Sequence, residues 1–316
     1  TIFSNSILSG VNFSGADLEG AQFAGATMNA TIFDNAKLDN TNIGANSSPT
    51  SASDASFVNA SLKNTRLFLV GHHIDFSLAD LTDTTFYLTG GEAILEAANL
   101  SNATLRFSGS GKHNFTGALL DDFVILPGTN CNHCNFSDTT GDVVRIYGGT
   151  ASGSNMQSMT FAGANISNLS LYGNSNSYGN FNYTSFAGAT LDNLYIYGNF
   201  LYCNFEGSEL HMARINASVS YANFDSASLV EATLYSSSKF YDTSFVGADF
   251  ANSRWYISYS YGGLYQLQGA DFSGANLFDS YFYRTYINPA YEPIWNNTTC
   301  PDGSNSDDNG GMCNLY

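Results

Sequence analysis

The chain has 316 residues, of which 43% are apolar and only 12% are charged, so uncharged polar side chains must keep it soluble. Its 27 acidic and 10 basic residues give a net charge of −17, which argues against direct binding to nucleic acid or to an anionic membrane surface. The negative charge is still compatible with a protein that mimics nucleic acid. No apolar run approaches the length of a membrane span, so we expect no transmembrane segment.

An apolar residue recurs at every fifth position from the start of the chain. A helical stripe repeats near 3.6 residues and a strand near 2, so this period predicts a coil that turns a corner every five residues. If four pentapeptides make one turn, residue i lies beneath residue i+20, and Phe3 should stack on Phe23 and Phe13 on Phe33. The row begins with Phe3, Leu8, Phe13, Leu18, Phe23, Met28, Phe33, Leu38 and Ile43.

The five-residue spacing is interrupted at intervals and resumes after each interruption, until Ile287. We expect each of these resets of the phase to be an insertion at a corner. The clearest insertion is 46–55, which contains Pro49. Ordering five residues costs about 5 to 10 kcal/mol of backbone entropy, whereas burying one Phe or Leu returns about 1.5 to 3 kcal/mol. The repeats must therefore fold together, and we predict a single continuous solenoid over 1–290 and a tail over 291–316.

Units with a small residue, Asp or Asn, and an apolar residue in succession resemble the A(D/N)LXX signature of pentapeptide-repeat proteins. The resemblance covers nearly the whole chain to Ile287. It implies an all-β fold, the right-handed quadrilateral parallel β-helix of that family, here with loop insertions at the corners. The units are Ala16-Asp17-Leu18, Ala79-Asp80-Leu81, Ala98-Asn99-Leu100, Ala248-Asp249-Phe250, Ala270-Asp271-Phe272 and Ala275-Asn276-Leu277.

The tail, 298–316, resembles the ending of secreted bacterial pentapeptide-repeat proteins, in which two cysteines bracket a loop of Gly, Asp and Asn. The resemblance implies a Cys300–Cys313 disulfide, which would contribute about 3 kcal/mol and requires an oxidising compartment. No basic and apolar leader opens the chain, so either a signal was removed before Thr1 or the protein is cytoplasmic. The cysteines favour a secreted or cell-surface protein.

Oxygen-bearing side chains cluster in the same loop. Their spacing could wrap around a hard cation such as calcium, but the full EF-hand spacing and a bidentate Glu are missing. The alternative is a solvated turn closed by the disulfide. The candidate ligands are Asp302, Asn305, Asp307 and Asp308. We predict no other cofactor.

The segment Cys131-Asn132-His133-Cys134 invites a metal or haem interpretation. The order is wrong for haem attachment, and no second ligand pair appears, so we expect Cys131 and Cys134 to be small buried residues or a local disulfide. The remaining histidines are interpreted as ordinary surface or corner residues: His72, His73, His113 and His211. No nucleophile elbow or phosphate loop is present, and we predict that the protein is not an enzyme.

Tyrosines crowd the second half of the chain, mostly outside the inward-facing frame. They either pack under corner loops or form a contact surface. The first coil, in phase from Phe3, has no polar cap, so we expect the end of another copy to cover it. The candidate interface residues are Thr1, Phe3, Tyr256, Tyr259, Tyr261, Tyr265, Tyr281, Tyr283 and Tyr286.

These expectations favour a non-enzymatic, exported structural protein. Its copies would be rigid β-solenoids that assemble head to tail into an extracellular filament or surface layer. One alternative is an acidic mimic of DNA that binds a topoisomerase, as some proteins of the resembled family do. A second alternative is a carbohydrate-binding solenoid that makes its glycan contacts through the tyrosines.

Overall fold

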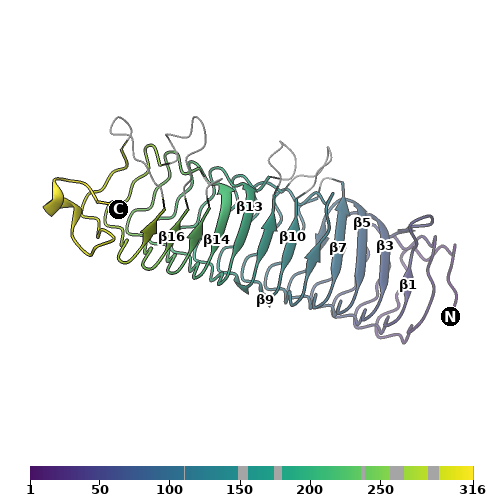
Figure 1. Cartoon of the computed structure of the whole chain (residues 1–316). Coiled ribbons are helices and arrows are strands. Elements are labelled where there is room, and N and C mark those ends of the chain that lie inside the picture. The colour runs from purple at the N-terminus through teal and green to yellow at the C-terminus, as the bar shows by residue number, and fades with distance from the viewer. Residues whose placement is uncertain are drawn as a thin grey trace. The chain divides into compact units, whose positions relative to one another are not determined.

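A computed structural model of the chain describes residues 1–109, 111–148, 156–173, 180–235, 239–256, 267–283 and 292–315. It divides into two compact units, Thr1–Thr160 and Phe161–Tyr316, and each is described by itself. Within each unit, parallel strands and bridges join successive turns of a right-handed quadrilateral β-helix (Figure 1). The predicted fold class is confirmed. The described residues include no helix that is long and apolar enough to cross a membrane.

The first unit has one main sheet, in which β1, β3, β5, β7 and β8 follow one another and β10 pairs with β8. Figure 1 shows β1, β3, β5 and β7 side by side along it. The strands of the first unit are β1 (Asn42–Ile43), β2 (Thr50–Ser51), β3 (Arg66–Gly71), β4 (Ile74–Asp75), β5 (Thr85–Gly90), β6 (Ala93–Ile94), β7 (Thr104–Ser108), β8 (Val124–Ile125), β9 (Thr140–Asp142) and β10 (Arg145–Tyr147).

The main sheet of the second unit runs in the order β12, β13, β14, β15, β16 and β17, with every printed pairing parallel. Its strands are β11 (Asn165–Ser167), β12 (Ser170–Tyr172), β13 (Tyr195–Asn199), β14 (Arg214–Ser218), β15 (Thr233–Leu234), β16 (Arg254–Trp255) and β17 (Tyr281–Phe282). A short 3-10 helix, η2 (Ser306–Asn309), lies in the tail.

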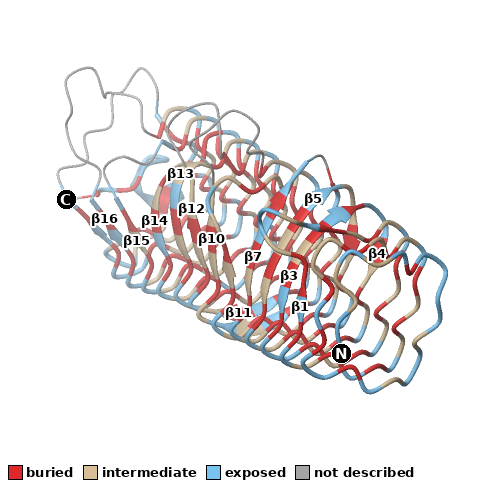
Figure 2. Ribbon diagram, turned by 90° about the vertical axis from the view of Figure 1, so that its right-hand side faces the viewer, coloured by how far each residue is buried: buried red, intermediate tan, exposed pale blue. Residues whose placement is uncertain are grey.

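The core is a set of side-chain columns, one residue from each coil. In the first coils the ring of Phe3 stacks on that of Phe23 at 5.0 Å and Phe13 on Phe33 at 5.3 Å, which confirms the predicted four-pentapeptide turn. Phe23 and Phe33 meet edge to face across the interior at 5.8 Å. Figure 2 shows the resulting alternation of buried and exposed residues along the longer strands.

The corners depend on a left-handed backbone two residues after each inward apolar residue. After Phe33 the chain turns at Asn35, whose φ is 60°, and the amide of Ala36 donates to the carbonyl of Phe33 at 2.9 Å. Asn, Asp and Gly tolerate this conformation better than other residues, which explains why they recur at the corners.

The prediction that every reset of phase is an insertion is wrong for several coils. Arg66 pairs with Thr85 and Leu67 with Phe86, so this coil has 19 residues and is one residue short. The physical reason is that β3 runs straight through the place of a corner, with Leu67 and Leu69 both pointing inward and buried. Strands β5 and β7 repeat the arrangement, which gives the first unit a flat sheet with long strands.

The second unit continues its coil into the tail. Asn276 bridges to Thr299 in parallel, and the ring of Trp295 stacks on that of Phe272 at 4.8 Å. The coil thus extends past the boundary predicted at residue 290. The continuity of the solenoid over 1–290 stays a prediction.

His113 is not a surface residue, contrary to the expectation from the sequence. Its side chain is only 2% exposed, its ring lies 3.7 Å from that of Phe107, and its Nδ1 accepts a hydrogen bond from the amide of Ala93 at 3.2 Å. Burial lowers the pKa of His113 from 6.5 to about 3. The imidazole is therefore a neutral member of the core.

Stability of the first unit should fall as the pH is lowered below about 6.5, because the unfolded imidazole of His113 takes up a proton there and the folded one does so only near pH 3. The expected slope is roughly 1 kcal/mol per pH unit within that window. Urea unfolding at pH 7, 6, 5 and 4 measures it. His113→Gln retains an acceptor without titrating, so the variant should show a shallower slope, and equal slopes would contradict the assignment.

Gly90 should resist substitution, because a Cβ there would lie 2.1 Å from the carbonyl oxygen of Gly71 on the neighbouring coil, at a φ of 136°. Gly90→Ala should therefore destabilise the first unit by more than about 2 kcal/mol. Gly15→Ala is the control, because its φ is 67° but no atom lies within 4 Å of the added Cβ. We expect the control to cost about 1 kcal/mol in urea unfolding. Equal costs would show that the close approach is unimportant.

Candidate functional site

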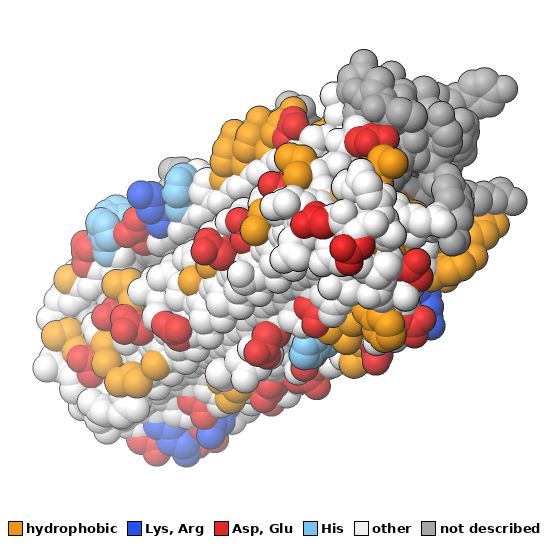
Figure 3. Space-filling model, turned by 90° about the vertical axis from the view of Figure 1, so that its left-hand side faces the viewer, with side chains coloured by type: hydrophobic (Ala, Val, Ile, Leu, Met, Phe, Trp, Pro, Cys, Tyr) orange, Lys and Arg blue, Asp and Glu red, His pale blue; other side chains and the backbone are white. Residues whose placement is uncertain are grey.

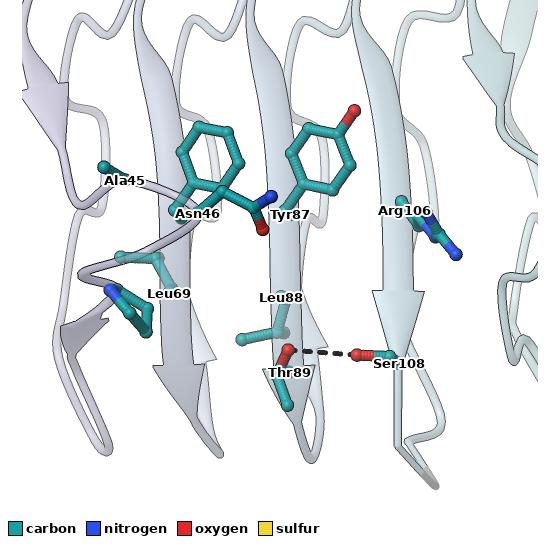
Figure 4. Close-up of a pocket in the computed structure, with 10 residues that line it drawn as sticks. Ala45, Asn46, Leu69, Tyr87, Leu88, Thr89, Arg106 and Ser108 are labelled. Atoms are coloured by element: carbon teal, nitrogen blue, oxygen red, sulfur yellow. Dashed lines mark hydrogen bonds between the residues drawn. The ribbon is translucent and has the colours of Figure 1, made fainter.

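The outward face of the main sheet in the first unit holds a groove. Strands β3, β5 and β7 form its floor, and the loop with Ala45, Asn46 and Pro49 borders it (Figure 4). The cavity has a volume of about 420 Å³. The remaining lining residues are Phe68, Leu69, Tyr87, Leu88, Thr89, Arg106 and Ser108.

Aromatic and polar side chains stand in register across this floor. The rings of Phe68 and Tyr87 are parallel at 4.9 Å, and Arg106 occupies the same register position on the next coil. The hydroxyls of Thr89 and Ser108 are hydrogen-bonded at 3.0 Å along a second line. In Figure 4, Tyr87 and Arg106 stand on neighbouring strands, with Thr89 and Ser108 farther along the same two strands. The groove therefore combines a ring surface, a cation and hydroxyls.

The local sequence explains why the groove is here. Strands β3, β5 and β7 continue straight where a regular coil would turn a corner. Each strand therefore displays further outward side chains at alternate positions, such as Phe68 and Val70 on β3. Gly71 and Gly90 then pack backbone to backbone at the strand ends, where a Cβ would clash. The insertion after Ile43 supplies the bordering loop, and Ala45 and Ser48 bridge across its turn.

The main sheet of the second unit presents two outward rows of side chains. The first row carries Tyr195, Arg214, Thr233, Arg254 and Tyr281, one from each successive strand. The second row, two residues farther along each strand, carries Tyr172, Tyr197, Asn216, Tyr235, Tyr256 and Tyr283. Tyr281 is 56% exposed and Tyr197 is 44% exposed, so these rings face outward.

The structure thus places part of the predicted tyrosine interface together on one face. Tyr256 and Tyr283 are neighbours in the second row, with ring centroids 6.1 Å apart, and Tyr281 ends the first row. Of the other predicted interface residues, Thr1 is exposed and Phe3 is half-buried in the first coil. Four predicted residues lie outside the described part of the chain: Tyr259, Tyr261, Tyr265 and Tyr286.

Every described arginine lies in a main sheet, although the repeat pattern alone does not indicate it. They are Arg66, Arg106 and Arg145 in the first unit and Arg214 and Arg254 in the second. Among the described residues none of these arginines forms an ion pair, and the cations that do are Lys37, Lys63, His73 and His211. In a chain of net charge −17, guanidinium groups without acidic partners stand out as ligand-binding candidates.

Three corner tyrosines of the second unit form another ladder. The rings of Tyr183 and Tyr202 are 5.1 Å apart, and those of Tyr202 and Tyr221 are 4.8 Å apart, all nearly parallel. Each has a left-handed backbone, with φ between 59° and 62°. That conformation costs about 1 to 2 kcal/mol per residue, and ring contacts of about 0.5 to 1.5 kcal/mol offset part of it.

The tail forms a compact loop closed by a Cys300–Cys313 disulfide. Oδ1 of Asp302 accepts hydrogen bonds from the amide and hydroxyl of Ser304, which lower the pKa of its carboxyl. Oδ1 of Asp307 accepts from the amide of Asn297. Asn305 caps η2, whose first turn includes Asp308. These side chains have local structural roles, and a calcium ion here stays a prediction.

Cys131 and Cys134 also form a disulfide, and both are fully buried in the first unit. The sequence left two interpretations open for this pair, small buried residues or a local disulfide, and the structure has the disulfide. Cys203 is free and buried, and burial raises the pKa of its thiol to about 12, so it is no nucleophile. Across the described ranges no group of three or more His, Cys, Asp or Glu side chains could hold a metal ion.

The fold and the outward face define the class: a parallel β-helical scaffold with aromatic and basic residues on its sheet surfaces. The family model for pentapeptide repeats matches residues 6–44 with eight copies, and no curated protein matches the chain. The match shows pentapeptide repeats over residues 6–44, and the coil geometry described above is similar to that of this family along both units.

Solved structures of pentapeptide-repeat proteins are also similar. HetL of the cyanobacterium Nostoc, involved in heterocyst differentiation regulation, is 17% identical, with 96% of this chain and 91% of HetL covered and a TM-score of 0.16. A pentapeptide repeat protein of the Arabidopsis thaliana thylakoid lumen is 28% identical, with 38% and 69% covered and a TM-score of 0.18. QnrB1, a plasmid-mediated fluoroquinolone resistance protein, is 15% identical, with 82% and 90% covered and a TM-score of 0.19. With TM-scores this low, we infer nothing about the function of this chain from the three structures.

Proposed function

We propose that this solenoid is a non-enzymatic, exported binding scaffold whose sheet face holds carbohydrate. The observation that carries the proposal is the groove of the first unit, where the Phe68 and Tyr87 rings lie in register with Arg106. Sugar rings have an apolar face of C–H groups and an edge of hydroxyls. A surface that offers both ring faces and hydrogen-bonding groups fits such a chain.

The residues that line the groove are more suited to ligand binding than to catalysis. Its lining residues include no carboxylate and no histidine, whereas hydrolysis of a glycosidic bond normally uses a pair of carboxyl groups. The Arg106 guanidinium and the hydroxyls of Thr89 and Ser108 can donate hydrogen bonds to a ligand but cannot act as a general base near pH 7.

An extracellular location is part of the proposal. The Cys300–Cys313 and Cys131–Cys134 disulfides support it, because such bonds persist in oxidising compartments and are rare in the cytosol. The low share of charged residues and the many small polar side chains also suit a surface that meets hydrated glycans.

An acidic mimic of DNA has less support. On the face shown in Figure 3, acidic side chains are dispersed among uncharged ones instead of forming a continuous stripe. The described main-sheet strands of both units also contain arginines and no Asp or Glu, so these faces are not negatively charged. Both features weaken an imitation of a regularly charged duplex.

A second candidate function is the assembly of copies into a filament or surface layer, for which two exposed apolar side chains of the first unit offer a contact. Ile2 is 76% exposed and Ile7 is 83% exposed, beside the half-buried Phe3. Adjacent exposed apolar side chains are common at contacts between protein copies. Both lie at outward positions, paired with Gln22 and Thr27 of the next coil, so a second copy that covers them would pack against the side of the coil.

Loss of the aromatic anchor should abolish most carbohydrate binding. We expect the wild-type protein to bind a subset of glycans on an array and Tyr87→Ala to bind them about ten-fold more weakly in titration, because the ring is the central contact of the groove. Tyr183→Ala, which removes an exposed corner tyrosine of the second unit, is the matched control and should bind as wild type does. A blank array, or equal losses in both variants, would contradict the proposal.

Self-association should depend on the first coil. Sedimentation of the purified protein should show oligomers that grow with concentration, and Ile2→Asp together with Ile7→Asp should leave monomers, since the charges would be buried in the contact. Val246→Asp, at a side chain that is also exposed, is the control and should leave assembly intact. Monomers of the wild type at all concentrations would rule out the filament.

A further inference from the structure

The first row of the second unit contains a notch between two arginines. Arg214 on β14 and Arg254 on β16 occupy the same register position, with the smaller Thr233 of β15 between them. A depression of about 530 Å³ lies over this part of the sheet. It is lined by Asn193, Met212, Arg214, Glu231, Thr233, Asn252 and Arg254.

The two guanidinium groups are free to bind a ligand. Both arginines are exposed, and within the described residues of the second unit neither forms an ion pair, even with Glu231, which lines the same depression. Glu231 lies at the corner, beside the strand, as do Asn193, Met212 and Asn252. The notch therefore keeps an excess of one positive charge in a strongly acidic protein.

We propose that this notch binds an anionic polysaccharide that carries a carboxylate or sulfate on every second sugar. Neighbouring coils are about 4.8 Å apart, so the two arginines are separated by roughly 9 to 10 Å. One pyranose unit spans about one coil spacing, so acidic groups on alternate sugars would meet Arg214 and Arg254 in turn. The guanidinium fork binds either anion in a bidentate manner.

The flanking residues fit the same ligand. Tyr195 and Tyr281 flank the arginines in the same row, and Tyr235 and Tyr256 lie in the adjacent row. The intervening neutral sugar would lie over Thr233, and the rings beyond the arginines would pack against the next sugars. This inference rests on the proposed carbohydrate function and specifies the charge and periodicity of its ligand.

A nucleic acid fits less well. Its phosphates recur on every nucleotide, so a strand along the row would place unpaired charge over Thr233 and against a protein of net charge −17. A polysaccharide with alternate charges places a neutral unit there. We therefore commit to the polysaccharide and use single-stranded DNA as a comparison ligand.

Titration calorimetry with hyaluronan oligosaccharides, which alternate a uronate and an N-acetyl sugar, tests the inference at low salt. The same oligosaccharides with their carboxylates reduced to alcohols are the neutral control. Wild type should bind the acidic form at least ten-fold more tightly, with affinity falling as salt is added. Arg214→Gln together with Arg254→Gln should bind the acidic form about ten-fold to a hundred-fold more weakly.

Lys37→Gln together with Lys63→Gln is the matched control, because it changes the net charge equally at lysines already paired with Glu19 and Asp80. It should reduce affinity less than three-fold, and a loss equal to that of the arginine variant would overturn the site. Equal binding of the acidic and reduced forms would overturn this inference and leave the proposed function, which depends on Tyr87, intact. Equally tight binding of a thymidine oligonucleotide would overturn the assignment to polysaccharide.

Discussion

The structure depends on the stacking of like side chains at the spacing of hydrogen-bonded coils. Parallel backbone bonds between turns fix each residue above its counterpart in the previous coil, as between Phe33 and Phe57, whose rings are 4.9 Å apart. A single pentapeptide gains too little from burial to offset its backbone entropy, so only the column is stable. The same constraint that builds the interior columns also aligns the outward side chains. Surface residues on successive coils therefore become rows with a fixed repeat.

The proposed binding surface of the first unit follows from departures from the regular pentapeptide coil. A strict pentapeptide coil bends every five residues and offers narrow faces. Where β3, β5 and β7 lose a corner, the face widens and can display the Phe68 and Tyr87 pair beside Arg106. Where the coil lengthens, as between Ile43 and Thr50, the added residues form the border of the groove. The proposed groove of the first unit thus lies at irregular coils, while the regular coils at the start of the chain keep narrow faces.

Much of the fold could be predicted from the sequence, because a large side chain at every fifth position is a strong local signal. The stacking of Phe3 on Phe23 followed directly from the period. The short coils could not be predicted from the sequence. With a period of five, the loss of one residue and the insertion of four shift the apolar row to the same position. His113 was misplaced for this reason, since its burial depends on the coil lengths before and after it. The arginine rows were missed because Arg214 and Arg254 come into the same row, on either side of Thr233, only through coil register. A signal was present nonetheless: Arg66, Arg145, Arg214 and Arg254 each directly precede an inward apolar residue.

Hydrogen–deuterium exchange of the protein with and without a bound acidic oligosaccharide tests the central claim, that rows on the main sheets are the binding surface. The account predicts added protection at the strand edges and adjoining corners around Arg214, Thr233 and Arg254, where the ligand would exclude water. The corner ladder at Tyr183 and the loop closed by Cys300 and Cys313 should exchange as in the free protein. Protection confined to that ladder or loop, with none over the sheet, would contradict the account.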